Sequence, residues 1–409
     1  MHQYELPLTI PEALEDVNYV VFAGGTGGKN VAPGMVESIK ELDSGSQVAI
    51  MTTTGDKGSK TGNRRLASEM AENELPLPGI GDIRAIASAL STNGAGALTG
   101  IRFSSEASRH DVESINEKLL GYIDSSELSG RVESALYEHT PKILDSIFEY
   151  ESTQATAQGE SSKGLKGYTM GNLALEALFS HHNGDLMAAT TDLNAVLKTS
   201  AFVMPVTNAA YDLKMEYDGQ FYQNEDEIDN LTIQEPEKVT AFWLEATDPM
   251  RTDEFTVHSL AKYVVKRSHA IVAPGSFWTT HGGILSVPEM SHALQASKAN
   301  GNKFDAIANI AKGRDLGGFS FEKYVTDLGG LAGRALDHVV TDDGVDALPE
   351  DMVPFKYDGN SKDMPTRVIT ARLVKNGTSA ADANDPLASH RFTKIVTDGS
   401  AAVRALVTV

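Results

Sequence analysis

Short apolar runs alternate with helix-like stretches near the N-terminus. Residues 17–23 (VNYVVFA) and 47–53 (QVAIMTT) are nearly continuous apolar runs, which is typical of β-strands buried on both faces. The segment over about 33–42 between them has the spacing of a helix. This order predicts a strand–helix–strand unit with parallel strands. A Pro/Gly turn and a second helix follow within residues 74–91, ELPLPGIGDIRAIASALS.

The middle of the chain departs from this alternation in two places. We expect a helical insertion over 110–170, helical to about residue 150 and then a mobile loop rich in Ser, Gln and Gly. Residues 205–245 contain short alternating apolar and polar stretches around an Asp218-Gly219 turn, which predicts a β-rich insertion with a hairpin.

Strand and helix patterns alternate again after these insertions. The last part, 340–409, is expected to complete the sheet with one strand and a final helix. No fixed-period repeat is evident. The pattern therefore predicts a single α/β domain over 1–409, with a doubly wound, mainly parallel sheet and two insertions.

Composition and charge exclude several classes of function. The 409 residues include no cysteine, so iron–sulfur clusters and thiolate zinc sites are excluded. The formal charge of −21 argues against nucleic acid as a partner, because phosphate backbones require a basic surface. No apolar run approaches the ~18 residues of a membrane helix. We expect a cytoplasmic protein that binds no membrane.

The glycine cluster 24–28 (GGTGG) follows the first predicted strand and precedes the first helix. It fails the Walker A pattern, because Ala23 replaces the first Gly and Asn30 the Ser or Thr. It also fails the dinucleotide fingerprint, since Asn30 stands at the third Gly and no acid ends the second strand. Two interpretations stay open: backbone N–H groups that bind a phosphate, or a turn that only allows close helix packing.

Four further polar loops follow apolar runs or open helices. The first loop contains Asp56, Gly58 and Ser59, and the second contains Asp82 and Arg84. The third contains Gly171 and Asn172, and the fourth contains Pro274, Gly275 and Ser276. Loops at the carboxyl ends of parallel strands converge on one crevice. Glycine turns, acids, an amide and hydroxyls suit a phosphorylated ligand that carries a ribose.

Taken in order, these motifs resemble the family that joins 2-phospho-L-lactate transferase (CofD) with the YvcK-type gluconeogenesis factors. The similarity extends from about residue 17 to about 325. Its motifs are GGTG at 24–27, GDKGSKTGNR at 55–64, PGIGDIR at 78–84, Arg102-Phe103, GNL at 171–173, PVT at 205–207, PGSFWTT at 274–280, and Asn309 at the end of a strand.

Several positions depart from the family pattern. Tyr168 stands where a His is usual, Gly55 replaces the first of two acids, and His281-Gly282-Gly283 replaces a Pro-rich stretch. The segment from about residue 340 matches poorly. The Asp-rich segment of the transferase branch is missing, which places the chain nearer the YvcK-type branch.

The resemblance implies a Rossmann-like three-layer α/β/α fold, a homodimer, and a crevice for a nucleotide or a UDP-sugar-like nucleotide sugar. A YvcK-type protein would regulate central carbon or cell-wall metabolism. A CofD-like enzyme would instead transfer a phospholactyl or phosphoenolpyruvyl group from a nucleotide diphosphate carrier to an alcohol, with Mg²⁺. An NAD-dependent oxidoreductase is the third alternative.

Each candidate residue has a chemical role in this interpretation. Asp56 would be catalytic or bind Mg²⁺, and Asp82 is the alternative catalytic acid unless it only caps its helix beside Arg84. Asn172 and Ser276 would hold a base or ribose, and Arg102 a diphosphate. The ligand-binding residues expected overall are Gly25, Thr26, Gly27, Gly28, Lys29, Gly58, Ser59, Arg84, Arg102, Gly171, Asn172, Thr207, Pro274, Gly275, Ser276 and Asn309.

Overall fold

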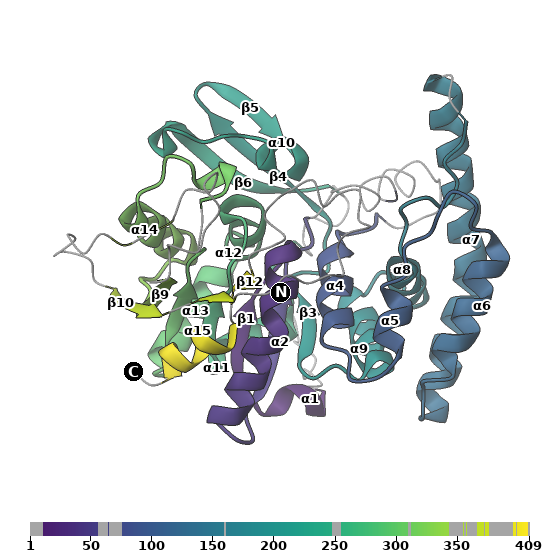
Figure 1. Cartoon of the computed structure of the whole chain (residues 1–409), viewed down its shortest axis with the longest axis horizontal. Coiled ribbons are helices and arrows are strands. Elements are labelled where there is room, and N and C mark those ends of the chain that lie inside the picture. The colour runs from purple at the N-terminus through teal and green to yellow at the C-terminus, as the bar shows by residue number, and fades with distance from the viewer. Residues whose placement is uncertain are drawn as a thin grey trace, which may run out of the picture.

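A seven-stranded parallel sheet forms the centre of the molecule (Figure 1). The computed structural model describes residues 11–55, 64, 76–158, 161–247, 255–309, 312–342, 355, 357, 366–371, 373–375, 396–397 and 399–407. The strands lie in the order β10-β9-β8-β7-β1-β2-β3. Their bounds are β1 Val17–Phe22, β2 Gln47–Thr52, β3 Phe202–Pro205, β7 His269–Val272, β8 Phe304–Ile307, β9 His338–Asp342 and β10 Arg367–Ala371.

This strand order is that of a doubly wound α/β fold. From β1 the chain moves outward through β2 to β3, then returns to β7 on the other side of β1 and moves outward through β8, β9 and β10. Every pair of neighbouring strands is parallel. The predicted Rossmann-like three-layer α/β/α architecture is therefore confirmed, and the sheet reverses direction between β1 and β7.

Both faces of the sheet are buried, which explains the continuous apolar runs in its strands. Successive residues of β1 point to opposite faces, so that Val21 joins one hydrophobic cluster while Val20 and Phe22 join the other. The first cluster includes side chains of α2 (Gly25–Leu42), α4 (Gly81–Ala89), α8 (Met170–His181), α9 (Leu186–Leu197) and α15 (Gly399–Val407). The second includes α11 (Ser259–Arg267), α13 (Met290–Ala299) and α14 (Phe321–Ala332).

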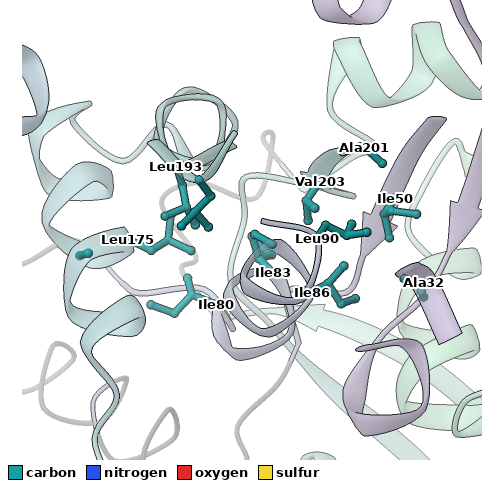
Figure 2. Close-up of a cluster of buried hydrophobic side chains, with 14 of the residues drawn as sticks. Ala32, Ile50, Ile80, Ile83, Ile86, Leu90, Leu175, Leu193, Ala201 and Val203 are labelled. Atoms are coloured by element: carbon teal, nitrogen blue, oxygen red, sulfur yellow. The ribbon is translucent and has the colours of Figure 1, made fainter. Parts of the chain in front are cut away.

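Helix α4 is the central element of the first cluster (Figure 2). Ile83 and Ile86 are fully buried, and they lie between Leu193 of α9 on one side and Ile50 of β2 on the other. Their spacing of three residues places both side chains on the face of α4 that turns toward the sheet. The helix that begins with Asp82 and Arg84 is thereby fixed to β2 and β3.

The predicted helical insertion over 110–170 corresponds to α6 (Arg109–Leu120) and α7 (Ser126–Gln158), and the short helix α5 (Ala95–Thr99) precedes it. Helix α7 packs against α8 at the side of the molecule (Figure 1). Helix α7 continues to Gln158, so residues 151–158, which we expected in a loop, are helical. Burial explains the difference, because Glu151 and Ala155 lie within the interior. Glu151 accepts a hydrogen bond from the Tyr168 hydroxyl at 3.0 Å.

The β-rich segment forms a separate three-stranded antiparallel sheet in the order β5-β4-β6. It contains β4 (Tyr211–Tyr217), β5 (Gln220–Gln223), α10 (Glu225–Asp229), η1 (Pro236–Lys238) and β6 (Val239–Ala246). Asp218 and Gly219 join β4 to β5 with φ angles of 49° and 71°, as the predicted hairpin requires. Tyr211, Leu213 and Met215 anchor this sheet in the second hydrophobic cluster.

The C-terminal part adds β9 and β10 to one edge of the sheet and then α15, which lies along α2 (Figure 1). Ala402, Val403 and Leu406 of α15 are buried in the first cluster, and Ser400 Oγ donates to the Gly34 carbonyl at 3.0 Å. The remaining elements are α1 (Glu12–Glu15), η3 (Phe277–Gly282), α12 (Gly283–Leu285), η4 (Arg314–Leu316), β11 (Val374–Lys375) and β12 (Val396–Thr397). Within the described ranges, no helix has both the length and the apolar character needed to cross a membrane.

Truncation of the α4 core should be costly. Ile83→Ala removes a fully buried side chain beside β2 and should lower the free energy of unfolding by about 2–5 kcal/mol in denaturant titration. Leu42→Ala is the matched control, since Leu42 is 41% exposed at the end of α2, and it should cost less than about 0.5 kcal/mol. Equal losses in the two variants would contradict this account of the core.

Candidate functional site

The carboxyl ends of β1 and β7 meet at the point where the sheet changes direction. Ala23 and Ala273 extend these strands by one residue each, since Ala23 N–H donates to the Met51 carbonyl and Ala273 N–H to the Phe22 carbonyl. The chain then leaves β1 through Gly24 and β7 through Pro274. In open α/β sheets this is the place where ligands bind.

Helix α2 begins within the glycine cluster. The pattern predicted a helix over about 33–42, but the structure has α2 from Gly25, so the glycines form its first turn. The first N–H groups of a helix have no partner within the helix, and Gly24 at the N-cap has no side chain to accept them. These N–H groups, with the positive end of the helix dipole, form an anion-binding terminus.

Close packing explains why glycines occupy this first turn. A Cβ on Gly24 would lie 2.7 Å from Asp82 Oδ2, and one on Gly27 would lie 2.9 Å from the Pro274 carbonyl oxygen. A Cβ on Gly28 would lie 2.9 Å from the Ala23 Cβ. Both sequence interpretations of the cluster are thus compatible with the structure, since the glycines permit close packing and leave the N–H groups of the turn uncapped.

Two side chains hold the Pro274–Ser276 turn in place against α2. Asn309, after β8, accepts the Gly275 N–H at 3.0 Å through Oδ1 and donates to the Gly275 carbonyl at 2.9 Å through Nδ2. His281, in the π-helical segment η3, donates from Nε2 to the Ala273 carbonyl at 2.9 Å. Burial lowers the pKa of His281 to about 4, so the ring is neutral at physiological pH.

Arg84 of α4 and Asn172 of α8 lie next to each other. Arg84 Nε donates to Asn172 Oδ1 at 2.9 Å, and a Cβ on Gly171 would lie 2.6 Å from Arg84 Cγ. The N-termini of α4 and α8 are therefore in contact through predicted site residues. Arg102 is exposed, and it donates to the Gly167 carbonyl, just before α8, at 2.9 Å.

Two further predicted residues, Thr207 and Lys29, lie at or near the same edge of the sheet. Thr207 follows β3, is buried, and accepts the Ala209 N–H at 3.2 Å through its hydroxyl. The side chain of Lys29 is exposed on the first turns of α2. Asp56, Gly58 and Ser59 lie outside the described residues, as does the side chain of Thr26. The predictions for Asp56 as catalytic acid or Mg²⁺ ligand are therefore untested.

Pattern reasoning did not single out several residues of the site. Thr280 Cγ2 would lie 3.0 Å from a Cβ on Gly24, which places η3 directly against the start of α2. Tyr211, from the β-rich insertion, donates to the Gly283 carbonyl at 2.5 Å and contacts Thr53 Oγ1 at 2.7 Å. The sequence signal for Thr280 is its place in the motif at 274–280. Tyr211 has no local signal, because its contacts join residues far apart in the chain.

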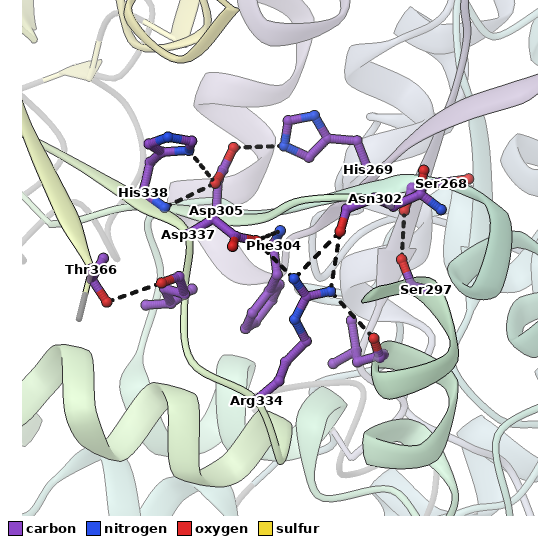
Figure 3. Close-up of polar contacts among 12 residues, drawn as sticks. Ser268, His269, Ser297, Asn302, Phe304, Asp305, Arg334, Asp337, His338 and Thr366 are labelled. Atoms are coloured by element: carbon purple, nitrogen blue, oxygen red, sulfur yellow. Dashed lines mark hydrogen bonds and ion pairs between the residues drawn. The ribbon is translucent and has the colours of Figure 1, made fainter. Parts of the chain in front are cut away.

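A second polar cluster lies at the amino ends of the strands, away from the glycine turn (Figure 3). Asp305, fully buried on β8, contacts His269 Nε2 at 2.6 Å and His338 Nδ1 at 2.9 Å. Arg334 pairs with Asp337 at 2.7 Å and donates to the Asn302 carbonyl at 3.4 Å. This cluster ties β7, β8 and β9 together at the end of the sheet opposite the glycine turn.

The carboxylates and histidines of the described ranges form no group of three or more arranged to hold a metal ion. Asp82 is the predicted acid that the structure places at the first turn of α2. Arg64, which belongs to the same polar loop as Asp56, forms a buried ion pair with Glu176 of α8.

Comparisons with known proteins agree with this arrangement. The family described as 2-phospho-L-lactate transferase CofD matches residues 19–374. A protein of Aquifex aeolicus named "Putative gluconeogenesis factor" is 24% identical over 287 residues, which are 70% of this chain and 66% of that protein. One of the same name from Yersinia pestis is 26% identical over 234 residues, 56% of this chain and 69% of that protein. The chain therefore spans about two thirds of these relatives.

Solved structures show the same fold. Protein BH3568 of Bacillus halodurans aligns with a TM-score of 0.65 at 17% identity, covering 96% of this chain and all of that one (100%). A second structure of BH3568, described as a member of the UPF0052 family, has a TM-score of 0.66 at 18% identity, covering 96% and 99% of the two chains. At these identities the similarity extends to the fold alone.

Asn309 should be essential for the geometry of the Pro274–Ser276 turn. Asn309→Ala removes both hydrogen bonds to Gly275 and should lower the free energy of unfolding by about 1–3 kcal/mol. Asn309→Asp can still accept from the Gly275 N–H, but it places a carboxylate oxygen where Nδ2 donates to the Gly275 carbonyl, so at neutral pH it should not restore the lost stability. Amide hydrogen exchange at Gly275 gives the local measurement, and unchanged protection in Asn309→Ala would contradict the assignment.

Proposed function

The chain belongs to the CofD family, and on that premise we propose that it binds a nucleotide or nucleotide sugar of the UDP-sugar type. The diphosphate would lie at the first turn of α2. Binding would regulate central carbon or cell-wall metabolism, and the relatives named as gluconeogenesis factors support the first of these. The observation that carries the proposal is an uncapped, glycine-lined helix start at the switch point of the sheet.

The chemistry of the crevice supports a nucleotide over a simple phosphate. Backbone N–H groups of Gly25 and Gly27 suit phosphate oxygens, because they are fixed donors at the positive end of a helix dipole. Arg84 and Asn172 add a cation and an amide at the adjoining helix starts. Amides donate and accept hydrogen bonds, which suits a base edge or a ribose hydroxyl.

Binding can be measured directly by titration calorimetry with UDP-N-acetylglucosamine and a panel of nucleotides. Gly27→Asp places a carboxylate at the proposed phosphate position and against the Pro274 carbonyl, so it should weaken binding by at least about tenfold. Gly130→Asp is the control, because a Cβ on Gly130 of α7 meets no atom within 4 Å. It should bind as the unchanged protein does.

Both Gly27→Asp and Gly130→Asp are compared well below their own unfolding midpoints, so that a loss of binding does not reflect a loss of fold. If no nucleotide or nucleotide sugar binds to the unchanged protein, the proposal is wrong. Equal affinity in Gly27→Asp and the unchanged protein would refute the placement of the phosphate.

A second function, CofD-like group transfer, is favoured by the position of Asp82. Its carboxylate lies at the start of α2, where it would repel a phosphate unless a cation lay between them. Mg²⁺ binds one or two carboxylates together with phosphate oxygens, so Asp82 fits as a ligand and Asp56 is the second candidate. When bound, Mg²⁺ would neutralise phosphate charge, while α2 and Arg84 orient the donor.

Asp82→Asn separates a binder from an enzyme. It removes the charge and keeps the side-chain size, so turnover of a guanosine-linked phospholactyl donor with a deazaflavin alcohol should fall by about 10²-fold or more. Nucleotide affinity should change far less. Asp327→Asn, which removes an ion pair with Lys323 on α14, is the control. Unchanged turnover in Asp82→Asn would rule out this role.

A further inference from the structure

The hydroxyl of Ser276 lies between two carboxylates. Ser276 Oγ is 3.0 Å from Asp315 Oδ2 and 3.3 Å from Asp229 Oδ1. It also accepts the Thr279 N–H at 3.3 Å, as the N-cap of η3. Ser276 ends the turn that faces α2, so these contacts connect the candidate site to two other parts of the chain.

The number of protons in this arrangement is limited. A serine hydroxyl has one proton to donate, and the shorter contact assigns it to Asp315. The contact between Ser276 Oγ and Asp229 Oδ1 is then a hydrogen bond only when Asp229 itself carries a proton. With both carboxylates ionised, two oxygens with lone pairs face each other across 3.3 Å, and the negative charges of Asp229 and Asp315 repel each other.

Burial of the carboxyl groups favours retention of this proton. Burial raises the pKa of Asp229 from 3.8 to about 6, and the charge of Asp315 adds to this rise. The Thr279 hydroxyl, 2.9 Å away, opposes the rise, and so does any hydrogen bond that Ser276 donates to Asp229. Burial also raises the pKa of Asp315, although the Phe277 N–H at 2.7 Å opposes that shift. Asp229 as a whole residue is exposed, so solvent screens part of this effect.

The groups around Asp229 add negative rather than positive charge. On α10, Asp226 raises the pKa of Asp229 further. Arg314 of η4 donates to Asn230 instead, His281 of η3 is neutral, and the buried Tyr324 of α14 faces Asp315. On β4, Lys214 pairs with Asp212 and Glu245 at the other face of the small sheet.

We propose that Asp229 is a positioning residue, and that one proton shared among Asp229, Ser276 and Asp315 fastens helix α10 of the β-rich insertion to the Pro274–Ser276 turn. Loss of this proton leaves the turn less tightly held beside the start of α2. The pH thereby controls how firmly the β-rich insertion holds the Pro274–Ser276 turn. The consequence for ligand affinity rests on the proposed function, whereas the consequence for stability does not.

The direction of the pH dependence follows from linkage. The fold raises the pKa of Asp229, so its protonated form is favoured in the folded state. In the unfolded chain the pKa of Asp229 has its ordinary value of 3.8. The stability that the proton contributes is therefore complete below about pH 4 and is lost as the pH rises through about 6. Asp229→Asn mimics the protonated acid, because its amide can donate to Ser276 Oγ at every pH.

Thermal unfolding at pH 5 and pH 7.5 tests the proposal. At each pH we take the unfolding midpoint of Asp229→Asn minus that of the unchanged protein. This difference should be about 1–2 °C larger at pH 7.5 than at pH 5. Glu216→Gln removes an acid from the exposed side of β4 in the same insertion, and its relative midpoint should be the same at both pH values. A relative midpoint of Asp229→Asn that does not change with pH would overturn the proposal.

Hydrogen exchange of the unchanged protein gives the same test without a substitution. Protection of the Phe277–Thr280 amides, corrected for intrinsic rates, should be lower at pH 7.5 than at pH 5, and equal protection would count against the shared proton. In calorimetry, affinity for UDP-N-acetylglucosamine should fall severalfold over this range and stay constant in Asp229→Asn. Failure to bind at either pH refutes the proposed function alone, because the stability result stands independently.

Discussion

Backbone packing at the start of α2 is the constraint on which the rest of the site depends. Gly24, Gly27 and Gly28 let this turn approach Asp82, Pro274 and Ala23 to distances that no side chain would allow. Every other element of the site is arranged around that approach: Asn309 and His281 hold the Pro274–Ser276 turn, and α4 presents Asp82 and Arg84. A residue larger than glycine would therefore displace several segments together.

The two ends of the sheet differ in their polar contacts. At the amino ends, Asp305 joins His269 and His338 in a buried cluster that ties three strands together. At the carboxyl ends, α2 begins at Gly25 after an N-cap glycine that has no side chain to accept the first N–H groups of the helix. The buried Asp305 cluster and the glycine turn therefore lie at opposite ends of the sheet.

Periodicity was sufficient to predict the fold class, because strands buried on both faces give continuous apolar runs such as 17–23 and 47–53. The order of polar loops was enough to bring Asp82, Gly275 and Asn309 to one edge. It could not place the start of α2, since glycine favours turns locally and only neighbours distant in sequence explain its use in a helix. Contacts such as Asp229 with Ser276 also leave no local pattern.

The packing of α15 along α2 has a consequence for the time at which the crevice is completed during synthesis. Ala402, Val403 and Leu406 cover the helix whose first turn lines the crevice, and Ser400 bonds to Gly34 in its middle. These contacts cannot form until residues 399–407 have left the ribosome. In a partly synthesised chain, the face of α2 that α15 covers is therefore still exposed to solvent. The surroundings of the glycine turn are complete only after most of the sheet has been made.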